Sequence, residues 1–167
     1  YVGIRVRIAF ESISGDSNAL HNTSNSTLDR ILDFKSKLNR FSGKLTPDVF
    51  HLFSESYWTP SNDPAIGRGT LSGACKPGTN TSVSEAYYGT LTLWAQVCSH
   101  ELGHNLSADH NHGTSCGVNS SLMCPEAHNT PTYMNVTESN VMKQFLSNLE
   151  SQTPPAITPN CMEYPVS

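Results

Sequence analysis

The segment that most constrains the fold of this chain is His100-Glu101-Leu102-Gly103-His104, followed six residues later by His110. Two histidines four residues apart project from the same face of a helix, and imidazoles placed in this way can bind one Zn²⁺. Glu101 points to the neighbouring edge of that face, where it can accept a proton from water at the metal. His110 lies beyond the expected end of the helix and can return as a third ligand. Three histidines and one open position are typical of a catalytic zinc site rather than a structural one.

The residues before this motif support a helix that starts near Gly89 or Thr90. Their spacing of three and four residues predicts a buried stripe on the side away from the ligands, formed by Leu91, Trp94, Cys98 and Leu102. On that stripe Cys98 is predicted to be a free, inert thiol. Five cysteines cannot all pair within one chain, so at least one of them is unpaired internally. A disulfide from Cys98 to another part of the domain is the alternative.

The composition suits one globular domain spanning residues 1–167, since 37% of the residues are hydrophobic. The formal net charge of −4 and the absence of a Lys/Arg cluster argue against a nucleic-acid partner. No apolar run in the sequence is long enough to cross a bilayer, and no signal peptide is present. We therefore expect a mature, soluble portion of a protein.

Asparagine sequons indicate the compartment. Asn105 begins one N-x-S/T triplet, but it lies within the histidine motif and is the least plausible glycan site. Five other sequons are candidate glycosylation sites: Asn22, Asn25, Asn80, Asn119 and Asn135. Together with the cysteines they favour a secreted protein or a cell-surface ectodomain, where disulfides persist.

Hydrophobic periodicity predicts a mixture of strands and helices. Strands are expected at residues 2–10, Val49 to Phe53, Arg68 to Ala74 (a weak edge strand) and Thr81 to Glu85. Helices are expected at Thr27 to about Arg40 and from a cap at Thr137 to about Glu150, the latter with four residues inward: Val141, Phe145, Leu146 and Leu149. His51, within a strand, is expected to be structural rather than a ligand.

A methionine, Met123, stands 13 residues after His110 and is followed two residues later by Pro125. With these residues the chain resembles a metzincin metallopeptidase, and more narrowly the adamalysin (reprolysin) family of snake-venom and ADAM-type enzymes. The resemblance implies an α+β, metzincin-like zincin fold with a mixed, mostly parallel twisted sheet. Residues 1–106 would form an upper subdomain with the active-site helix, and residues 107–167 a small, loop-rich lower subdomain. Met123 and Pro125 would form the methionine turn that supports the zinc histidines from below.

The resemblance also implies disulfides and a substrate site. The family pairs the cysteines equivalent to Cys75 and Cys161, which leaves Cys116 and Cys124 as the remaining candidates for a bond. Substrate would lie extended along the edge strand, adding main-chain hydrogen bonds, at Arg68, Gly69, Thr70 and Leu71. The wall of the main specificity pocket would begin at Pro125.

The chain departs from the family pattern at four places. Ser107 replaces a glycine at a position that is expected to need positive φ. Asn111 replaces an aspartate, and Cys124 follows Met123 whereas the family cysteine precedes the turn. The family's first strand and long helix are missing. We therefore expect a portion of a longer protein, with a companion N-terminal segment or propeptide and with further attached domains.

These observations predict a zinc endopeptidase that acts on protein or peptide substrates. His100, His104 and His110 would bind Zn²⁺, and Glu101 would be the general base. The first alternative is a catalytically impaired binding module that keeps the metalloprotease fold. Two others concern the ligands: Glu126 would replace the third histidine in a different zincin, and His112 competes with His110 because both lie in one short loop.

Overall fold

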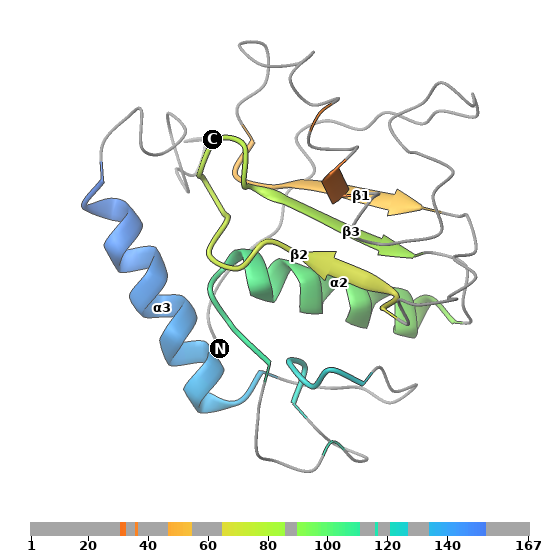
Figure 1. Ribbon diagram of the computed structural model, residues 1–167. Helices are drawn as coiled ribbons and strands as arrows, with labels where there is room; N and C mark the ends of the chain where they lie inside the picture. Colours follow the sequence, from red (N-terminus) through yellow and green to blue (C-terminus); the bar gives the residue numbers. More distant parts are fainter. Residues whose placement is uncertain are drawn as a thin grey trace, which may run out of the picture.

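The computed structural model describes residues 31, 32, 36, 47–54, 65–85, 90–110, 116, 121–126 and 134–152 of the chain. These residues include three strands and two helices: β1 (Phe50–Ser54), β2 (Gly67–Gly69), β3 (Thr81–Glu85), α2 (Leu91–Asn105) and α3 (Val136–Glu150). Figure 1 shows the strands as one sheet, with α2 running along it and α3 standing to one side. The described part of the chain is therefore an α+β structure, as predicted.

The sheet is mixed, with the strand order β1-β3-β2. β1 pairs with β3 in parallel, whereas β2 pairs with β3 in antiparallel fashion. All five residues of β3 are buried, since β3 is the central strand. β2 supplies the weak strand expected at Arg68 to Ala74, but it ends at Gly69, after which the chain turns back toward β3.

β1 carries a histidine that is enclosed by the sheet. His51 Nδ1 lies 2.7 Å from Ser82 Oγ, and His51 Nε2 lies 2.8 Å from Ser84 Oγ. Burial lowers the pKa of His51 to about 4, so the ring is neutral at pH 7. Because a hydroxyl can donate or accept, the two serines satisfy both ring nitrogens in either tautomer. These contacts support the structural role predicted for His51.

α2 begins at the predicted place. The side chain of Thr90 accepts a hydrogen bond from Leu93 N, which satisfies one of the amide groups left open at a helix start. The buried stripe predicted for this helix is wrong, however. Leu91 is 81% exposed, and the other three predicted members are only half-buried.

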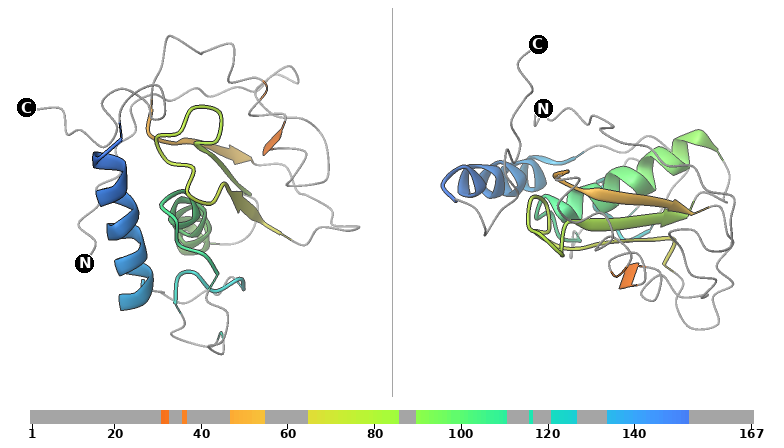
Figure 2. Two further views of the ribbon diagram at one scale, coloured as in Figure 1. Left: turned by 60° about the vertical axis from the view of Figure 1, so that its left-hand side comes forward. Right: turned by 90° about the horizontal axis from the view of Figure 1, so that it is seen from above.

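Four of the buried residues of α2 lie on another face, formed by Val97, Glu101, His104 and Asn105, whereas the buried Gly103 packs against Met123. This face is buried because β2 and β3 pack against it, and Figure 2 shows α2 close under these strands in both views. The packing is tight, since a Cβ atom on Gly69 would collide with the backbone of Glu101. The face that carries the histidine motif is therefore also the face that packs.

α3 begins at a capping box rather than at the predicted cap, Thr137. Asn135 Oδ1 accepts a hydrogen bond from Glu138 N (2.8 Å), and Glu138 Oε2 accepts one from Asn135 N (2.9 Å). The inward position predicted for Val141 is also wrong: Val141 is 41% exposed, whereas Met142 is 4% exposed. Met142 joins a buried cluster with Ala74, Leu106, Ala108 and Met123. The remaining predicted inward residues do pack on the core: Phe145, Leu146 and Leu149.

Part of the expected structure lies outside the described residues. This applies to the strand at residues 2–10 and to most of the helix predicted from Thr27 to Arg40. Ile31 and Leu32 from that helix have helical backbone, and Ile31 packs against Val83 of β3. Within the described ranges, neither helix combines the length and apolar character that spanning a bilayer requires.

Candidate metal centre

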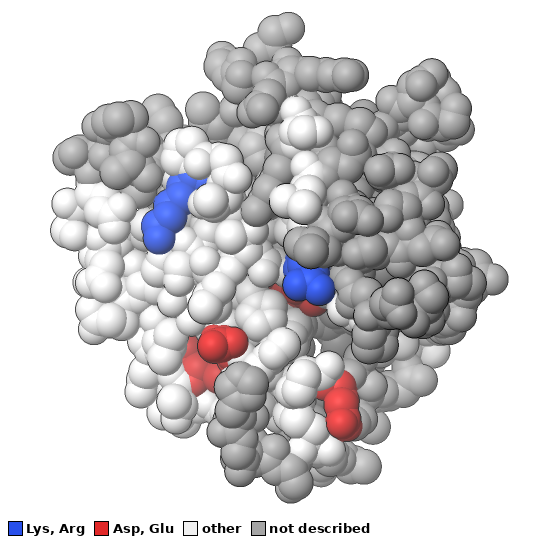
Figure 3. All heavy atoms as spheres, in the orientation of Figure 1, with Lys and Arg blue, Asp and Glu red and all other residues white. Residues whose placement is uncertain are grey.

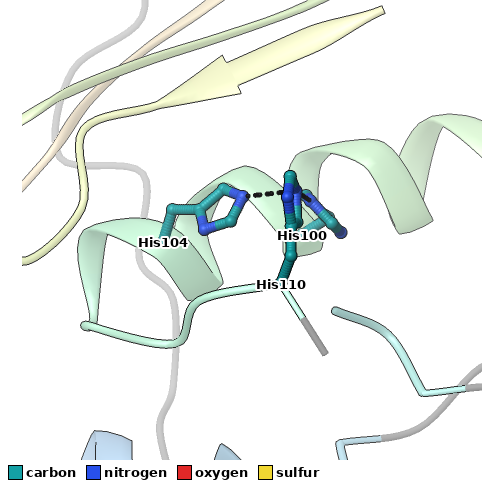
Figure 4. A group of neighbouring side chains, drawn as sticks. All are labelled: His100, His104 and His110. Carbon is teal, nitrogen blue, oxygen red and sulfur yellow. Dashed lines mark hydrogen bonds between the residues drawn. The ribbon is translucent and has the colours of Figure 1, made fainter. Parts of the chain in front are cut away.

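Three histidines meet at one point beside α2. His100 and His104 project from the helix, and His110 reaches them from the loop that follows, as Figure 4 shows. His110 Nε2 lies 3.1 Å from His100 Nε2 and 3.2 Å from His104 Nε2. The three possible ligand atoms all lie within 4.8 Å of one another, and this is the one such cluster found among the described residues. Glu126 is not part of it, and the competing His112 lies outside the described residues.

Backbone carbonyl groups orient the two helical imidazoles. His100 Nδ1 donates to Leu122 O and His104 Nδ1 donates to Ala108 O, each over 2.8 Å. Since a carbonyl oxygen can only accept, Nδ1 carries the hydrogen, and the lone pair of each Nε2 points toward the cluster. Burial lowers the pKa of His100 to about 4 and also lowers the pKa of His104. Neutral imidazoles that direct lone pairs at one another are the donor set that a metal cation requires.

Glu101 lies beside this cluster with a carboxyl group that is almost fully buried. It is 5% exposed, and its Oε2 accepts no hydrogen bond within the described structure. Burial raises the pKa of Glu101 to about 8, and the positive charge of Arg68 acts in the opposite direction. Gly67 leaves room for this carboxyl group, because a Cβ atom on Gly67 would collide with it. A carboxyl group that titrates near neutral pH can both take up and release a proton.

A cleft of about 320 Å³ opens in front of the histidines. Arg68, Gly69 and Leu71 border it on the side of β2, and Pro125 borders it on the opposite side. Thr70, which was also predicted to bind substrate, does not border the cleft. Its backbone faces the sheet instead, since Thr70 N donates to Thr81 O over 3.1 Å.

Gln96 and Val97 are among the cleft residues that were missed from the sequence. They precede His100 by four and three residues, so the helical spacing places them on the ligand face. The signal was therefore present in the sequence. It was hidden by the assumption that the packed face and the ligand face differ.

Met123 lies under the motif and is fully buried. A Cβ atom on Gly103 would come within 2.5 Å of Met123 Sδ, so the glycine allows the methionine to approach the helix. Met123 N donates to Ser121 Oγ (3.2 Å), and the Ser121 hydroxyl in turn donates to Glu138 at the start of α3. The segment that accepts the hydrogen bond from His100 is thus held from below by α3.

The cysteines agree with most of the predictions. Cys116 and Cys124 form a disulfide, and Cys75 is also disulfide-bonded, although its predicted partner, Cys161, lies outside the described residues. Cys98 is a free thiol. Burial raises the pKa of Cys98 to about 11, which makes this thiol unreactive at neutral pH.

The loop between His104 and His110 contains the expected left-handed residue. Ser107 has φ 78°, and Ser72, across from it, has φ 57°. A residue other than glycine costs about 1–2 kcal/mol in this conformation. Ser72 Oγ donates to Ser107 Oγ (2.9 Å), and the backbone N–H groups of both serines donate to His104 O. These hydrogen bonds offset the strain and join the loop to the segment that follows β2.

One of the predicted glycosylation sites does not agree with the folded structure. Asn80 is 3% exposed, and its Nδ2 donates to Pro47 O over 3.0 Å. A glycan on this nitrogen would break the hydrogen bond and require space that the fold does not provide. Asn135 is half-buried, and Asn22, Asn25 and Asn119 lie outside the described residues.

Known proteins are similar to parts of this chain. Residues 2–146 match Metallo-peptidase family M12, in its reprolysin form. Over 95 residues, 56% of this chain and 47% of the relative, the chain is 27% identical to snake venom metalloproteinase TM-1 of Protobothrops mucrosquamatus. Over 75 residues, 44% of this chain and 37% of the relative, it is 35% identical to snake venom metalloproteinase atroxlysin-1 of Bothrops atrox. The matched part spans less than half the length of either relative.

Proposed function

The chain belongs to the reprolysin-type metallopeptidases of family M12, and from this premise we propose that it is a secreted zinc endopeptidase that hydrolyses protein or peptide substrates. The observation that carries the proposal is the convergence of three imidazole nitrogens next to a buried carboxyl group. The relatives named above are venom metalloproteinases, which supports both the reaction class and an extracellular location.

The zinc would be held by His100, His104 and His110 through their Nε2 atoms. This donor set fits zinc, which accepts imidazole nitrogen and in catalytic sites keeps a fourth position open. When bound, zinc supplies a Lewis acid for the substrate carbonyl and lowers the pKa of bound water to about 7. The backbone oxygens of Leu122 and Ala108 would keep two of the imidazoles in the required tautomer.

Glu101 would move the proton. Its carboxylate takes a proton from the attacking water and then delivers it to the nitrogen of the leaving amine, which restores the carboxylate. Burial raises the pKa of Glu101 to about 8 against the opposing charge of Arg68, and a cation held by the neighbouring histidines would lower it again. The carboxylate is then available as a base near neutral pH.

The substrate would add to the edge of β2 that lies away from β3. Antiparallel strands direct alternate residues to opposite edges, so Gly69 would turn its backbone groups away from β3 if Thr70 turns toward it, and Leu71, in the turn that follows, would present its N–H on the same side as Gly69. Substrate paired with Gly69 and Leu71 would lie across the cleft in front of the histidines. Arg68 borders the same cleft, and Thr70 would act indirectly through its neighbours. Pro125 would begin the opposite wall, and Met123 would support the histidines.

The domain organisation also remains a proposal. Residues 1–106 would form the upper part with α2, and residues 107–167 the lower part with the methionine turn. The protein would include further segments, among them an N-terminal companion segment or propeptide. Four sequons remain candidates for glycans: Asn22, Asn25, Asn119 and Asn135.

The test combines metal analysis and proteolysis on one purified sample. The wild-type protein should contain one zinc per chain and should cleave an unfolded protein, and a chelator should stop the cleavage. Glu101→Gln should keep the zinc and lower kcat by about 10²- to 10⁴-fold. Glu126→Gln removes an exposed carboxylate at the rim and should lower kcat far less. Zinc binding without any cleavage by the wild type would favour the binding module.

A further inference from the structure

Asn105 joins the end of the metal helix to the strand that borders the cleft. The side chain is fully buried. Its Nδ2 donates to Thr70 O over 2.9 Å and to Thr81 O over 3.1 Å, and its backbone oxygen accepts a hydrogen bond from Ala74 N over 3.0 Å. One residue, adjacent to His104, therefore holds the end of β2, the start of β3 and the turn between them.

The carbonyl oxygen of Thr70 belongs to the same peptide group as the N–H of Leu71. A trans peptide is planar, so its C=O and N–H point in opposite directions. Asn105 holds Thr70 O on the side of the sheet and α2, and this fixes the Leu71 N–H on the other side. That side is the cleft, which Leu71 borders while 49% exposed. Gly73 N also donates to Thr70 O, over 3.1 Å, but it belongs to the same turn and cannot tie that turn to α2.

We propose that Asn105 is a positioning residue for substrate binding: by holding the Thr70 carbonyl, it aims the Leu71 N–H at a carbonyl oxygen of an extended peptide in the cleft. This inference rests on the proposed function, because it assumes that a peptide binds along β2. Asn105 touches neither the substrate nor the metal. Its loss should weaken the binding of long peptides while the metal ligands keep their places.

The experiment compares Asn105→Asp with the wild type. Aspartate has nearly the same shape but lacks the NH₂ group that bridges the two carbonyl oxygens. For a long peptide we expect KM to rise about 3- to 10-fold, because the peptide loses the strength of about one hydrogen bond. The value of kcat and the dissociation constant of zinc, measured by chelator competition, should change less than 3-fold. A peptide shortened so that it no longer reaches β2 should show the wild-type KM. Asn140→Asp, on an exposed part of α3, is the matched control.

A second variant and a second measurement cover the other outcomes. If Asn105→Asp does not fold, Asn105→Ala removes the same donors without placing a carboxylate in the core. Binding of the long peptide is also measured by calorimetry on zinc-loaded Glu101→Gln protein, with and without the Asn105 change, which requires no turnover. A wild type that binds the long peptide but cleaves nothing would overturn the proposed reaction and leave this inference standing. Equal losses for long and short peptides, or no loss for either, would overturn the inference alone, since a merely structural role affects both substrates alike.

Discussion

The part of the chain that the structure describes contains imidazoles in two places, in β1 and beside α2, and their environments differ in one respect. His51 in β1 and His100 in α2 both have pKa values of about 4 because both are buried. His51 places its two nitrogens against the hydroxyls of Ser82 and Ser84. In the other group the Nδ1 atoms of His100 and His104 donate to carbonyl oxygens, and the Nε2 atoms face one another.

This comparison shows that burial and a low pKa do not identify a metal ligand. What distinguishes the two groups is the atom that each ring nitrogen faces. Each nitrogen of the ring between two hydroxyls has a hydrogen-bond partner of its own, whereas the three Nε2 atoms face one another and together form a donor set that suits a metal cation. The predictions below test this difference.

The largest effect is expected from removing one imidazole of each group. His104→Ala should weaken zinc binding by more than about 100-fold and abolish proteolysis. The loss of zinc affinity should exceed the loss of about 10- to 100-fold that follows from changing a residue that only orients a ligand. His51→Asn should leave the zinc content at one ion per chain. Metal analysis after dialysis measures both. Loss of zinc from His51→Asn would remove the distinction between the two groups.

A second test changes the space beside the metal centre without changing an imidazole. Gly67→Ala places a methyl group against the carboxyl of Glu101. Displacing that group by about 1 Å should lower kcat about 10- to 100-fold, while zinc binding stays within a few-fold of the wild type. The result is read from kcat together with chelator competition. An unchanged kcat would argue against Glu101 as the proton carrier.

The third test uses pH to separate the sheet histidine from the rest. The pKa of His51 is lowered from 6.5 to about 4 in the folded chain. Below pH 6.5 the unfolded chain binds a proton at this ring before the folded chain does, so the free energy of unfolding falls as the pH falls from 6.5 toward 4. Between pH 7 and pH 5 this loss amounts to about 2 kcal/mol of unfolding free energy.

Urea unfolding of metal-free protein at both pH values gives the measurement. Wild type and His51→Asn share the other histidines, so the difference between their pH dependences belongs to His51. Identical pH dependences would contradict the pKa assigned to this ring.

The smallest effect concerns the loop that carries His110. His51 lies within a strand and depends on no such loop. Ser107→Gly and Ser107→Ala both lose the hydroxyl bonded to Ser72, but only glycine relieves the φ of 78°. The glycine variant should be the more stable of the two by about 1 kcal/mol. For a chain of this size the difference corresponds to about 2–4 °C in Tm. Equal Tm values would mean that the loop is unstrained.

The sequence alone predicted the parts of the site that depend on local spacing. The four-residue interval between His100 and His104 determines their common face, and the short distance to His110 allows the loop to return. β3 was predicted with its observed bounds, because it is a short buried run. Ser107 was expected to have positive φ, and it does.

The errors arose where tertiary packing competes with apolar periodicity. The stripe through Leu91 was inferred from hydrophobicity, but β2 covers the polar face of α2, where Glu101 and Asn105 are buried. For α3 the sequence does contain the signal, since Asn135 and Glu138 have the spacing of a capping box. Thr137 is also a common cap residue, but threonine ranks below asparagine at this position, and the capping box forms at Asn135. The role proposed for Asn105 depends on contacts 35 and 24 residues away in the sequence, which no local pattern encodes.

The position of the ligands along α2 has one more consequence. His104 lies in the last turn of the helix, where the aligned peptide dipoles place roughly half of a negative elementary charge. A cation at that end is stabilised by about 0.3–1 kcal/mol, and an anion is repelled. The direction of the helix therefore favours a cation over an anion at this site, independently of the side chains that would bind it.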